Sequence, residues 1–299
     1  MFGRLGPVFT VRTAEGEDVE CVARGDGKRA VVGDDVRFVP DADTEMAQGL
    51  IIGIGERRTA LVRADALGRR EQVLAANLDR IFVVTAVEPP LREGLIDRYL
   101  VVAHAQGIEA HIIFNKVDLI ADDPAALEDI GDRLAIYPRL GYPVHFTAAS
   151  TGAGLGDLRR ALRRRTSIFV GHSGVGKTSL LNALDPALGE RVQALSEASG
   201  RGRHTTSSSF LHVLPDGGEV IDSPGVRAFG LWDIDPDEVG SHFVELARLA
   251  PRCKFADCRH VHEPECAVLA AVEAGRIEES RYASYVNIRT SLLEDDPRH

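Results

Sequence analysis

Short runs of hydrophobic residues, separated by polar turns, predict β-strands in the first quarter of the chain. The runs cover residues 7–11, 19–23, 35–39 and 49–54. Glycine and aspartate occupy the turns between them, as in Gly25-Asp-Gly27. Strands this short and this regularly interrupted are typical of a small closed barrel. We therefore expect residues 1–74 to form an N-terminal β-barrel domain.

From residue 75 to about 235 the pattern changes, and apolar strands alternate with helices. Residues 80–87 form a nearly continuous apolar run, and helical periodicity appears at 95–106 and about 124–136. Further apolar runs lie at 110–114, 143–146, 167–170 and 219–221. Strands that are apolar on both faces and alternate with helices predict a mostly parallel sheet with helices on either side. Residues 75–235 are thus expected to form an α/β domain.

Helical patterns dominate the C-terminal segment, residues 236–299. They cover residues 239–250, 267–274 and 278–293, and the last six residues are expected to be a frayed tail. The whole chain is therefore predicted to be a multidomain α/β protein. A β-barrel comes first, an α/β domain lies in the middle, and a helical domain ends the chain.

The composition is that of an ordinary globular protein. Hydrophobic residues make up 44% of the 299 positions, which is enough for two or three buried cores. No apolar run approaches the length that spans a membrane, and the first residues do not resemble a signal peptide. With its few cysteines expected to stay reduced, the protein is predicted to be cytoplasmic, with no membrane partner. Nothing in the sequence requires more than a monomer.

Acidic residues outnumber basic ones in each of the three predicted domains, and the net charge is −10, so no domain is uniformly basic in the way that many nucleic-acid-binding domains are. Binding to RNA would have to depend on local patches of arginine and lysine. One candidate patch lies near the end of the predicted barrel and one lies in a cysteine-rich loop. They consist of Arg57, Arg58, Arg63, Arg69 and Arg70, and of Arg252, Lys254 and Arg259. Each is equally compatible with an ordinary solvated face.

The strongest chemical signal lies between the apolar run 167–170 and the helical segment 179–184. Glycines there let the chain bend, so that successive N–H groups point at phosphate oxygens beside the positive end of the next helix. We expect Lys177 to reach the terminal phosphates, and Thr178 to bind Mg²⁺. The segment therefore predicts binding of a nucleoside triphosphate. The predicted phosphate loop consists of Gly171, His172, Ser173, Gly174, Val175, Gly176, Lys177, Thr178 and Ser179.

The tetrapeptide Asn115-Lys-Val-Asp118 follows the apolar run 110–114 and predicts guanine as the base. A carboxylate at Asp118 can accept hydrogen bonds from N1–H and from the exocyclic amine of guanine, a donor pair that adenine lacks. We expect Asn115 to brace the neighbouring loops or the base carbonyl, and the stem of Lys116 to lie along the base. The tetrapeptide alone is a weak signal, and it gains weight from the phosphate loop in the same chain.

Small residues after the run 143–146 provide a second base-binding element. They are Ala148, Ala149 and Ser150, and they would let a backbone N–H approach the guanine oxygen. Taken alone, this segment is only a turn before a helix. Its assignment to the base therefore depends on the other motifs.

Two later segments are expected to respond to the γ-phosphate. Asp222 can hold Mg²⁺ through water, and the N–H of Gly225 can sense the γ-phosphate. The hydroxyl of Thr206, or of the adjacent Thr205, is expected to close onto Mg²⁺ only when the γ-phosphate is present. The base-binding elements thus precede the phosphate loop and the switches, which reverses the order found in ordinary small GTPases. A doubly wound sheet tolerates such a permutation, because the two ends of a domain usually lie close together.

Three of the four cysteines fall within fourteen residues, in the pattern Cys253-x4-Cys258-x-His260-x5-Cys266. Three thiolates and an imidazole make a closed, tetrahedral Zn²⁺ site of the structural kind. Because no position is left for water, we do not expect hydrolysis at this metal. His262 is the rival fourth ligand. The remaining cysteine, Cys21, lies in a predicted strand and is interpreted as a small buried apolar residue.

Together these motifs resemble the RsgA family, the circularly permuted GTPases of small ribosomal subunit biogenesis. The resemblance rests on the permuted order, on the segments that begin at Gly171, Gly202 and Asp222, and on the cysteine spacing. It covers essentially the whole chain. It implies an N-terminal OB-fold, a central permuted P-loop GTPase domain and a C-terminal zinc domain. It also implies the small ribosomal subunit and its rRNA as partners, with hydrolysis of GTP to GDP stimulated by the subunit late in assembly.

The chain departs from the family pattern in three places. His172 stands where the family usually has glutamine, Ser223 replaces a threonine, and Ala148 replaces a serine. None of these changes obstructs the binding of phosphate or base. The acidic balance of the chain is less typical of a protein that contacts the ribosome.

The expected mechanism follows from one missing side chain. Many GTPases orient the attacking water with glutamine directly after the Asp-x-x-Gly element, but here that residue is Val226. The free enzyme should therefore be slow, and a partner should complete the site by ordering the first switch. His204 is the candidate for positioning the water, although it could instead cap or pack the switch.

Two other classes of function remain open. A GTP-dependent kinase or a metallochaperone would need an acceptor pocket or an open metal site. A non-catalytic RNA-binding scaffold would use nucleotide only for structure, which intact Lys177, Thr178 and Asp222 argue against. Measuring GTP turnover with and without small ribosomal subunits separates these three classes.

Overall fold

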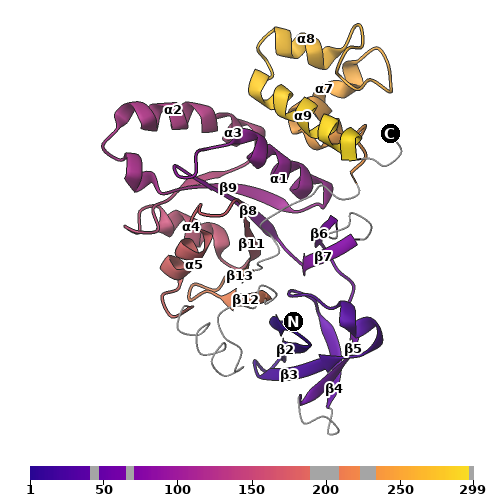
Figure 1. Ribbon diagram of the computed structural model, residues 1–299, viewed down its shortest axis with the longest axis vertical. Coiled ribbons are helices and arrows are strands. Elements are labelled where there is room, and N and C mark those ends of the chain that lie inside the picture. Colours follow the sequence, from indigo (N-terminus) through magenta and orange to yellow (C-terminus); the bar gives the residue numbers. More distant parts are fainter. Residues whose placement is uncertain (41–46, 65–70, 189–208, 223–233, 296–299) are drawn as a thin grey trace.

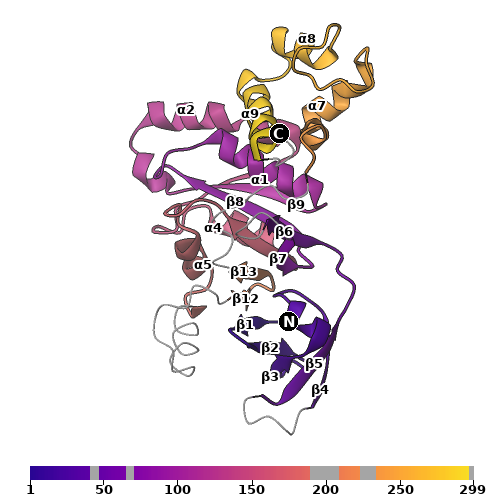
Figure 2. The ribbon, with the colours of Figure 1, turned by 45° about the vertical axis from the view of Figure 1, so that its right-hand side comes forward.

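The computed structural model describes residues 1–40, 47–64, 71–188, 209–222 and 234–295. An eleven-stranded mixed sheet runs through the described part, in the order β10-β9-β8-β11-β13-β12-β1-β2-β3-β5-β4. The N-terminal strands and the C-terminal helices lie at opposite ends of the molecule (Figures 1 and 2). The parallel part of the sheet lies between them.

The N-terminal strands enclose a small core of their own. Strands β2 and β3 are antiparallel, β3 and β5 are parallel, and β5 and β4 are antiparallel. Phe9, Val11, Cys21, Ala30 and Ile51 are buried together. The four predicted strands and the buried position of Cys21 are confirmed, whereas closure into a barrel stays a prediction. The elements are β1 (Gly3–Leu5), β2 (Val8–Arg12), β3 (Asp18–Ala23), η1 (Gly25–Arg29), β4 (Val36–Pro40) and β5 (Gly49–Ile54).

A separate hairpin follows the N-terminal strands. It pairs β6 (Ala60–Ala64) with β7 (Glu71–Ala76) in antiparallel register. Its buried leucines, Leu61 and Leu74, belong to the large hydrophobic core that also contains Val83 and Ile112 of the parallel strands. The predicted domain boundary at residue 74 therefore falls inside β7, in a strand that packs on the central core.

Five parallel strands form one end of the eleven-stranded sheet and make up the sheet of the central domain, in the order β10-β9-β8-β11-β13. Successive side chains on a strand point to opposite faces. Val83 and Ile112 pack with α1 and α2, whereas Phe82, Ile113 and Phe169 pack with α4 and α5. Helices α1 and α2 lie on one face of the sheet, and α4 and α5 lie on the other (Figure 1). The strands are apolar because both of their faces are covered. The elements are β8 (Arg80–Ala86), α1 (Glu93–Ala105), β9 (Glu109–Asn115), η2 (Val117–Ile120), α2 (Pro124–Leu134), α3 (Ile136–Leu140), β10 (Val144–Phe146), α4 (Leu155–Leu162), β11 (Thr166–Val170), α5 (Lys177–Leu184) and β13 (Glu219–Asp222).

Strand β12 (Ser209–Val213) was not expected from the sequence. It pairs antiparallel with β13 on one side and with β1 on the other, where Gly3 lies opposite Phe210. Its histidine and serine interrupt the apolar pattern, because only part of the strand is buried. Through β1 and β12, the N-terminal strands become continuous with the central sheet.

Helix α9 packs on α1 (Figure 2), and so does the short helix η4. Arg281 on α9 is almost fully buried and pairs with Asp97 on α1 and with Glu245 on α7. The predicted helix 239–250 is instead three short pieces, because buried Phe243 adopts an extended backbone between the first two. No helix in the described ranges is long and apolar enough to cross a membrane. The elements are η4 (Val239–His242), α7 (Val244–Leu249), η5 (Ala250–Arg252), α8 (Ala267–Glu273) and α9 (Glu279–Asp295).

Candidate nucleotide site and metal centre

The predicted nucleotide motifs lie where the parallel strands end. Strand β9 ends at Asn115, β10 leads to Ala148, β11 leads to the phosphate loop, and β13 ends at Asp222. The carboxyl ends of parallel strands meet at one edge of a sheet, which is where open α/β folds bind ligands. Motifs spread over more than a hundred residues are thus placed along a single edge.

Two glycines of the phosphate loop occupy positions where a side chain would not fit. Gly171 has φ +141°, and a Cβ there would lie 2.2 Å from the carbonyl oxygen of Val84. Gly176 has φ +95°, and a Cβ there would lie 2.4 Å from Nδ2 of Asn115. The loop therefore packs tightly against the end of β8 and against the base-recognition tetrapeptide. Helix α5 begins directly after Gly176.

Lys177 folds back over the phosphate loop. Its Nζ donates to the carbonyl oxygens of Gly171, at 2.7 Å, and His172, at 2.8 Å. The ammonium group therefore lies across the mouth of the loop. The hydroxyl-bearing residues Ser173, Thr178 and Ser179 are exposed beside it. These positions suit contacts to phosphate and to a hydrated cation.

Asn115 joins the base-recognition tetrapeptide to the phosphate loop. Its buried Nδ2 donates to the carbonyl oxygen of Val175 at 3.0 Å, across sixty residues of sequence. Its Oδ1 accepts from Oγ1 of Thr147 at 3.1 Å and from the N–H of Ala149 at 3.4 Å. One amide therefore connects three loops. Sequence reasoning predicted the bracing role of Asn115 but missed Thr147, which follows β10 without a distinctive pattern.

Asp118 has one carboxylate oxygen engaged and one without a partner. Oδ2 accepts from Oγ of Ser150 at 2.8 Å. Oδ1 is buried and has no hydrogen-bond partner among the described residues. Burying a carboxylate oxygen without a partner is unfavourable, and a ligand that donates a hydrogen bond would relieve it. Guanine carries such donors.

A cavity of about 390 Å³ lies between these elements. Its size suits a small ligand, because ligand pockets begin at about 300 Å³. It is lined by Asn115, Lys116, Asp118, Leu119, Ala149, Ser150, Gly176 and Ser179. The structure thus brings base-recognition and phosphate-loop residues to one cavity. Lys116 borders it in a left-handed backbone conformation, with its Nζ donating to the carbonyl oxygen of Glu88 at 2.6 Å.

Ala148 differs from its two neighbours. It is fully buried, and its N–H donates to the carbonyl oxygen of Ala153 at 3.0 Å. It therefore supports the turn, while Ala149 and Ser150 line the cavity. The sequence alone did not separate these three positions.

Asp222 is exposed at the end of β13, the strand that runs parallel to and beside β11. It therefore shares the sheet edge with Thr178, the other predicted Mg²⁺ ligand that the structure describes. The predicted switch residues His204, Thr205, Thr206 and Gly225 lie outside the described residues, as do Ser223 and Val226.

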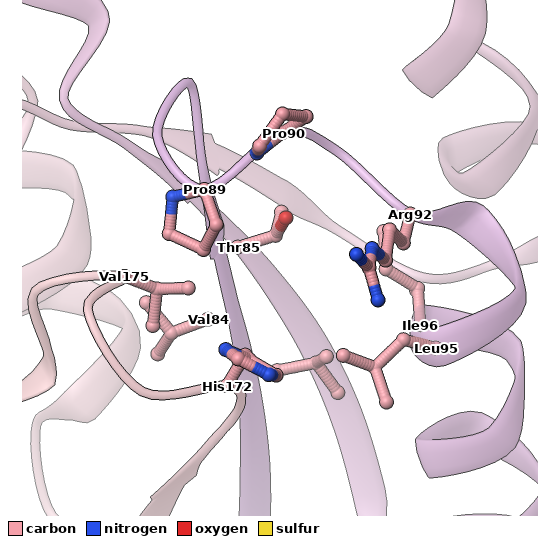
Figure 3. Close-up of a pocket in the computed structure, with 10 residues that line it drawn as sticks. Val84, Thr85, Pro89, Pro90, Arg92, Leu95, Ile96, His172 and Val175 are labelled. Atoms are coloured by element: carbon pink, nitrogen blue, oxygen red, sulfur yellow. The ribbon is translucent and has the colours of Figure 1, made fainter.

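A small cavity of about 40 Å³ lies on the other side of the phosphate loop, against α1 (Figure 3). His172 and Val175 reach it from the loop, and Leu95 and Ile96 reach it from α1. Buried Tyr99, also on α1, hydrogen-bonds to the backbone of Gly171, and burial raises its pKa to about 12. Helix α1 therefore supports the phosphate loop from behind. No motif marked Tyr99 in the sequence.

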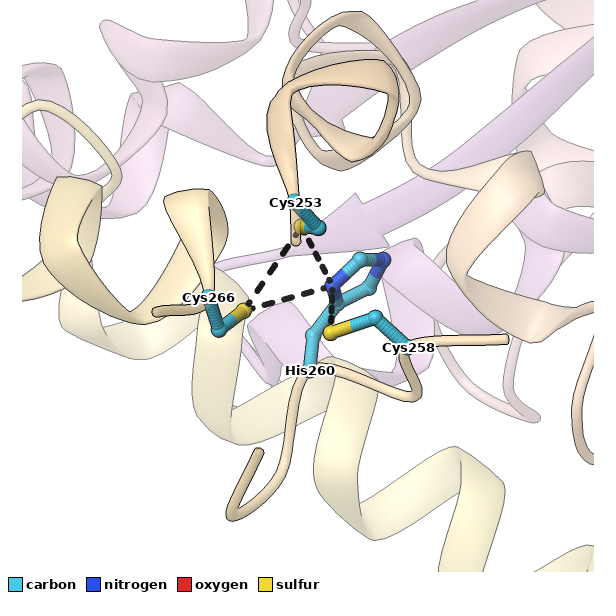
Figure 4. A group of neighbouring side chains, drawn as sticks. All are labelled: Cys253, Cys258, His260 and Cys266. Carbon is cyan, nitrogen blue, oxygen red and sulfur yellow. Dashed lines mark hydrogen bonds between the residues drawn. The ribbon is translucent and has the colours of Figure 1, made fainter. Parts of the chain in front are cut away.

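The predicted metal ligands converge in the C-terminal segment (Figure 4). Nδ1 of His260 lies 3.6, 3.4 and 3.4 Å from the sulfur atoms of Cys253, Cys258 and Cys266. The sulfur atoms of Cys253 and Cys266 are 3.9 Å apart. A tetrahedron with Zn–S bonds of about 2.3 Å has edges of about 3.8 Å. The four donor atoms therefore fit a tetrahedral Zn²⁺ centre, and the histidine faces it through Nδ1.

The basic residues predicted as RNA patches are partly engaged within the protein. Arg57 pairs with buried Asp34 at 2.7 Å, and Arg58 pairs with Asp79 at 3.2 Å. In the cysteine-rich loop, Lys254 pairs with Glu265, and Arg259 pairs with Asp237 at 2.6 Å. The positive charge of these four residues is therefore balanced within the protein, and Arg69 and Arg70 lie outside the described residues.

Comparison with known proteins decides the family. The profile of the RsgA GTPase family matches residues 54–232. The small ribosomal subunit biogenesis GTPase RsgA of Chlorobaculum parvum is 41% identical, over 97% of this chain and 96% of its own. The protein of the same name from Ectopseudomonas mendocina is 43% identical, over 94% of this chain and 80% of its own. The chain belongs to the RsgA GTPase family.

Solved structures agree with this assignment. YjeQ from Thermotoga maritima superposes with a TM-score of 0.77 at 35% identity, covering 96% of this chain and 95% of its own. YloQ, a circularly permuted GTPase, superposes with a TM-score of 0.75 at 30% identity, covering 100% and 95%. The mixed α/β fold of the permuted GTPases is thereby confirmed. As an RsgA GTPase the chain hydrolyses GTP, and the family implies GTP, GDP and Mg²⁺ as its ligands.

Proposed function

We propose that this RsgA GTPase is an assembly factor of the small ribosomal subunit, with GTP hydrolysis stimulated by the subunit during late maturation. The observation that supports a single guanine-nucleotide site is the hydrogen bond from Asn115 to the backbone of Val175, which joins the tetrapeptide at 115–118 to the phosphate loop. The names of the relatives at more than 40% identity support the ribosomal role. In this role GTP hydrolysis acts as a timer for release.

On this proposal the base binds in the 390 Å³ cavity. Asp118 accepts from N1–H and from the exocyclic amine of guanine, and the stem of Lys116 covers the base. Asn115 keeps the two loops together, while Ala149 and Ser150 close the far side. Ala148 takes part by supporting the turn rather than by direct contact.

The phosphates bind at the loop 171–178 and the start of α5. The N–H groups of the loop and the ammonium of Lys177 neutralise the phosphate oxygens. Thr178, Asp222 and Thr206, or alternatively Thr205, would hold Mg²⁺, which neutralises charge on the β- and γ-phosphates. Gly225 would report the γ-phosphate to the second switch.

His204 is proposed to position the attacking water. Val226 follows Gly225 and cannot hydrogen-bond to water, so basal turnover should be slow. Contact with the subunit would order the first switch and bring His204 to the γ-phosphate. We expect His204→Ala to keep its affinity for GTP and to lose most of the stimulated turnover. Stimulated turnover equal to wild type would remove His204 from the mechanism.

Two further assignments belong to this proposal. Cys253, Cys258, His260 and Cys266 would hold one structural Zn²⁺, because four thiolate and imidazole donors leave no position for substrate. The N-terminal strands would form an OB-fold barrel that contacts rRNA. The domains would be 1–74, 75–235 and 236–299, with the hairpin β6–β7 at the first boundary packed on the core of the central domain. The protein would act as a cytoplasmic monomer.

The decisive experiment measures GTP turnover by the full chain, alone and with purified small ribosomal subunits. A clear increase with small subunits, and none with large subunits, supports the proposal. Turnover that needs another acceptor would instead indicate a different GTP-dependent enzyme. Turnover that no partner increases, together with RNA binding, would indicate a scaffold.

A further inference from the structure

The loop that carries three of the four metal ligands has an unfavourable backbone conformation. It must bring Cys258, His260 and Cys266 around one point within nine residues. His260 itself has φ +56°, in the left-handed region that residues with side chains rarely adopt. Such a conformation persists only where the surrounding structure holds it. The contacts of this loop therefore determine whether the ligands are in place before the metal binds.

One carboxylate holds the N–H side of the loop. Oε1 of Glu263 accepts from the N–H of Arg259 at 2.9 Å. Oε2 accepts from the N–H groups of Val261 at 2.9 Å and of His262 at 3.1 Å. These residues surround His260 in sequence. The carboxylate of Glu263 is not one of the four donor atoms that face the metal position.

Helix α9 holds the carbonyl side of the same loop. The hydroxyl of Tyr282 donates to the carbonyl oxygen of His260 at 2.9 Å. The hydroxyl of Tyr285 donates to the carbonyl oxygen of Arg259. The peptide groups on both sides of His260 are thus anchored, and Glu263 supplies most of these anchors from within the loop. Without the Glu263 carboxylate, these three N–H groups would hydrogen-bond to water instead. Among the described residues, nothing on the N–H side of the loop would then hold His260 in its left-handed conformation.

We propose that Glu263 is a positioning residue of the metal centre, whose carboxylate holds the loop 258–266 in the conformation that binds the ion. The inference rests on the proposed Zn²⁺ site and adds to it a residue that does not touch the metal. Groups that orient metal ligands from outside the coordination sphere typically contribute a factor of about 10 to 100 in affinity. Glu263 does so through the backbone rather than through a ligand side chain.

The test compares Glu263→Gln with Glu265→Gln in the full chain. Glu265 is the matched control, because it lies in the same loop but is exposed and contacts Lys254 instead of the loop backbone. Zinc affinity is measured by competition with a chromophoric chelator, and Co²⁺ absorption reports the ligand set. We expect Glu263→Gln to bind Zn²⁺ about 10-fold or more weakly. Glu265→Gln should stay within about twofold of wild type, and saturating Co²⁺ should give the same spectrum in all three proteins, since the ligands are unchanged.

Melting temperature in excess chelator separates positioning from general stability. A positioning role leaves the metal-free melting temperature of Glu263→Gln close to that of wild type. If Glu263→Gln does not fold, Tyr282→Phe serves as the second variant. It removes one hydrogen bond to the backbone of His260 and should lower the affinity for Zn²⁺ by a smaller factor. Equal zinc affinity of wild type and Glu263→Gln, or an equal loss in Glu265→Gln, overturns the inference. Failure of the wild type to bind Zn²⁺ or Co²⁺ overturns the metal assignment itself.

Discussion

The nucleotide site and the metal centre are assembled in opposite ways. The nucleotide site gathers residues from the ends of four parallel strands, and its key contact joins Asn115 to Val175 across sixty residues. The metal centre takes all four donors from one short segment, Cys253 to Cys266. The first therefore depends on the whole central sheet. The second depends on one loop and on the helix α9 behind it.

This difference predicts how each site fails. A substitution in the metal loop should disorder the C-terminal segment and leave the sheet edge intact. A substitution at the sheet edge should change nucleotide binding and leave the metal centre intact. The two regions are also in contact, because the buried pair Arg281–Asp97 joins α9 to α1 and buried residues of the C-terminal helices share a hydrophobic core with α1.

The largest effect is expected from loss of a metal ligand. Cys258→Ser should abolish stoichiometric zinc, because structural Zn²⁺ contributes on the order of 10 kcal/mol of binding free energy. The C-terminal helices should then melt separately and at lower temperature, as calorimetry would show. GTP affinity should change by less than about threefold, since the sheet edge is formed elsewhere. A large loss of GTP affinity would show that the two regions are not independent.

Lys177→Ala should have the next largest effect, on nucleotide binding alone. The ammonium lies over the phosphate loop, and a charge-assisted contact of about 3 kcal/mol corresponds to a loss of about 100-fold in affinity. Fluorescent GDP titration measures the loss of affinity, with Lys28→Ala in the short N-terminal helix η1 as the control. Zinc content should stay at the wild-type level. Binding that survives at wild-type strength would mean that the loop does not hold phosphate.

Asp118→Asn should exchange the base preference. The amide can donate to the second carbonyl of xanthine, where the carboxylate accepts from the amine of guanine. We expect GTP affinity to fall by about 2 kcal/mol, roughly 30-fold, with a matching gain for xanthosine triphosphate. Competition between the two nucleotides measures the exchange. Retention of full GTP preference would place the base outside the 390 Å³ cavity.

Asn115→Ala should have a smaller effect on both halves of the nucleotide site. It removes the hydrogen bond to Val175 and leaves Thr147 without its acceptor, at a cost of about 1–3 kcal/mol. GTP and xanthosine triphosphate should be weakened equally, which distinguishes bracing from base reading. Unequal losses, measured in the same competition assay, would assign Asn115 to the base.

The smallest effect concerns pH. Burial, with the neighbouring His111, lowers the pKa of His145 from 6.5 to about 4, although Asp157 on α4 opposes the shift and Arg80 on β8 adds to it. His111 has a lowered pKa for the same main reason, and it contacts His145 at 2.9 Å and Glu109 at 3.0 Å. The unfolded chain therefore binds these protons more readily, so stability should fall as pH falls from 6.5 toward 4.

Comparing wild type with His145→Gln isolates the contribution of His145 to the pH dependence of stability. We expect the melting temperature of wild type to drop more between pH 7 and pH 5 than that of His145→Gln. Both proteins are measured in excess chelator, so that release of zinc at low pH does not contribute to the change in melting temperature. Parallel curves would show that His145 does not titrate on unfolding.

The two sites also differ in how far the sequence alone predicted them. The metal centre needed only spacing, because its donors are neighbours along the chain, and the structure places all four together. The phosphate loop and the tetrapeptide at 115–118 were recognisable separately. Asn115 was expected to brace the neighbouring loops or the base carbonyl, but nothing in the sequence showed that it reaches Val175. Tyr99, Thr147 and Glu263 were missed because no sequence pattern shows their partners. Tyr99 and Glu263 contact backbone groups, whereas Thr147 donates to the side chain of Asn115.

The fold, too, was predicted only in part from the sequence. Strands with both faces covered, such as β8 and β9, were predicted from their apolar runs. Strand β12 was missed, because its residues are only partly buried and carry a mixed pattern. The hairpin β6–β7 was assigned to the N-terminal unit, although Leu61 and Leu74 pack in the central core. A pattern of apolar positions shows that a segment is buried, but not against which core.

The pairing of β1 with β12 has a practical consequence for dividing the molecule. A fragment that starts at residue 75 would lose β1, and the outer backbone groups of β12 would face solvent without partners. Unprotected sheet borders of this kind recruit other chains and promote aggregation. An isolated GTPase fragment should therefore be produced with residues 1–12 retained or supplied as a separate peptide.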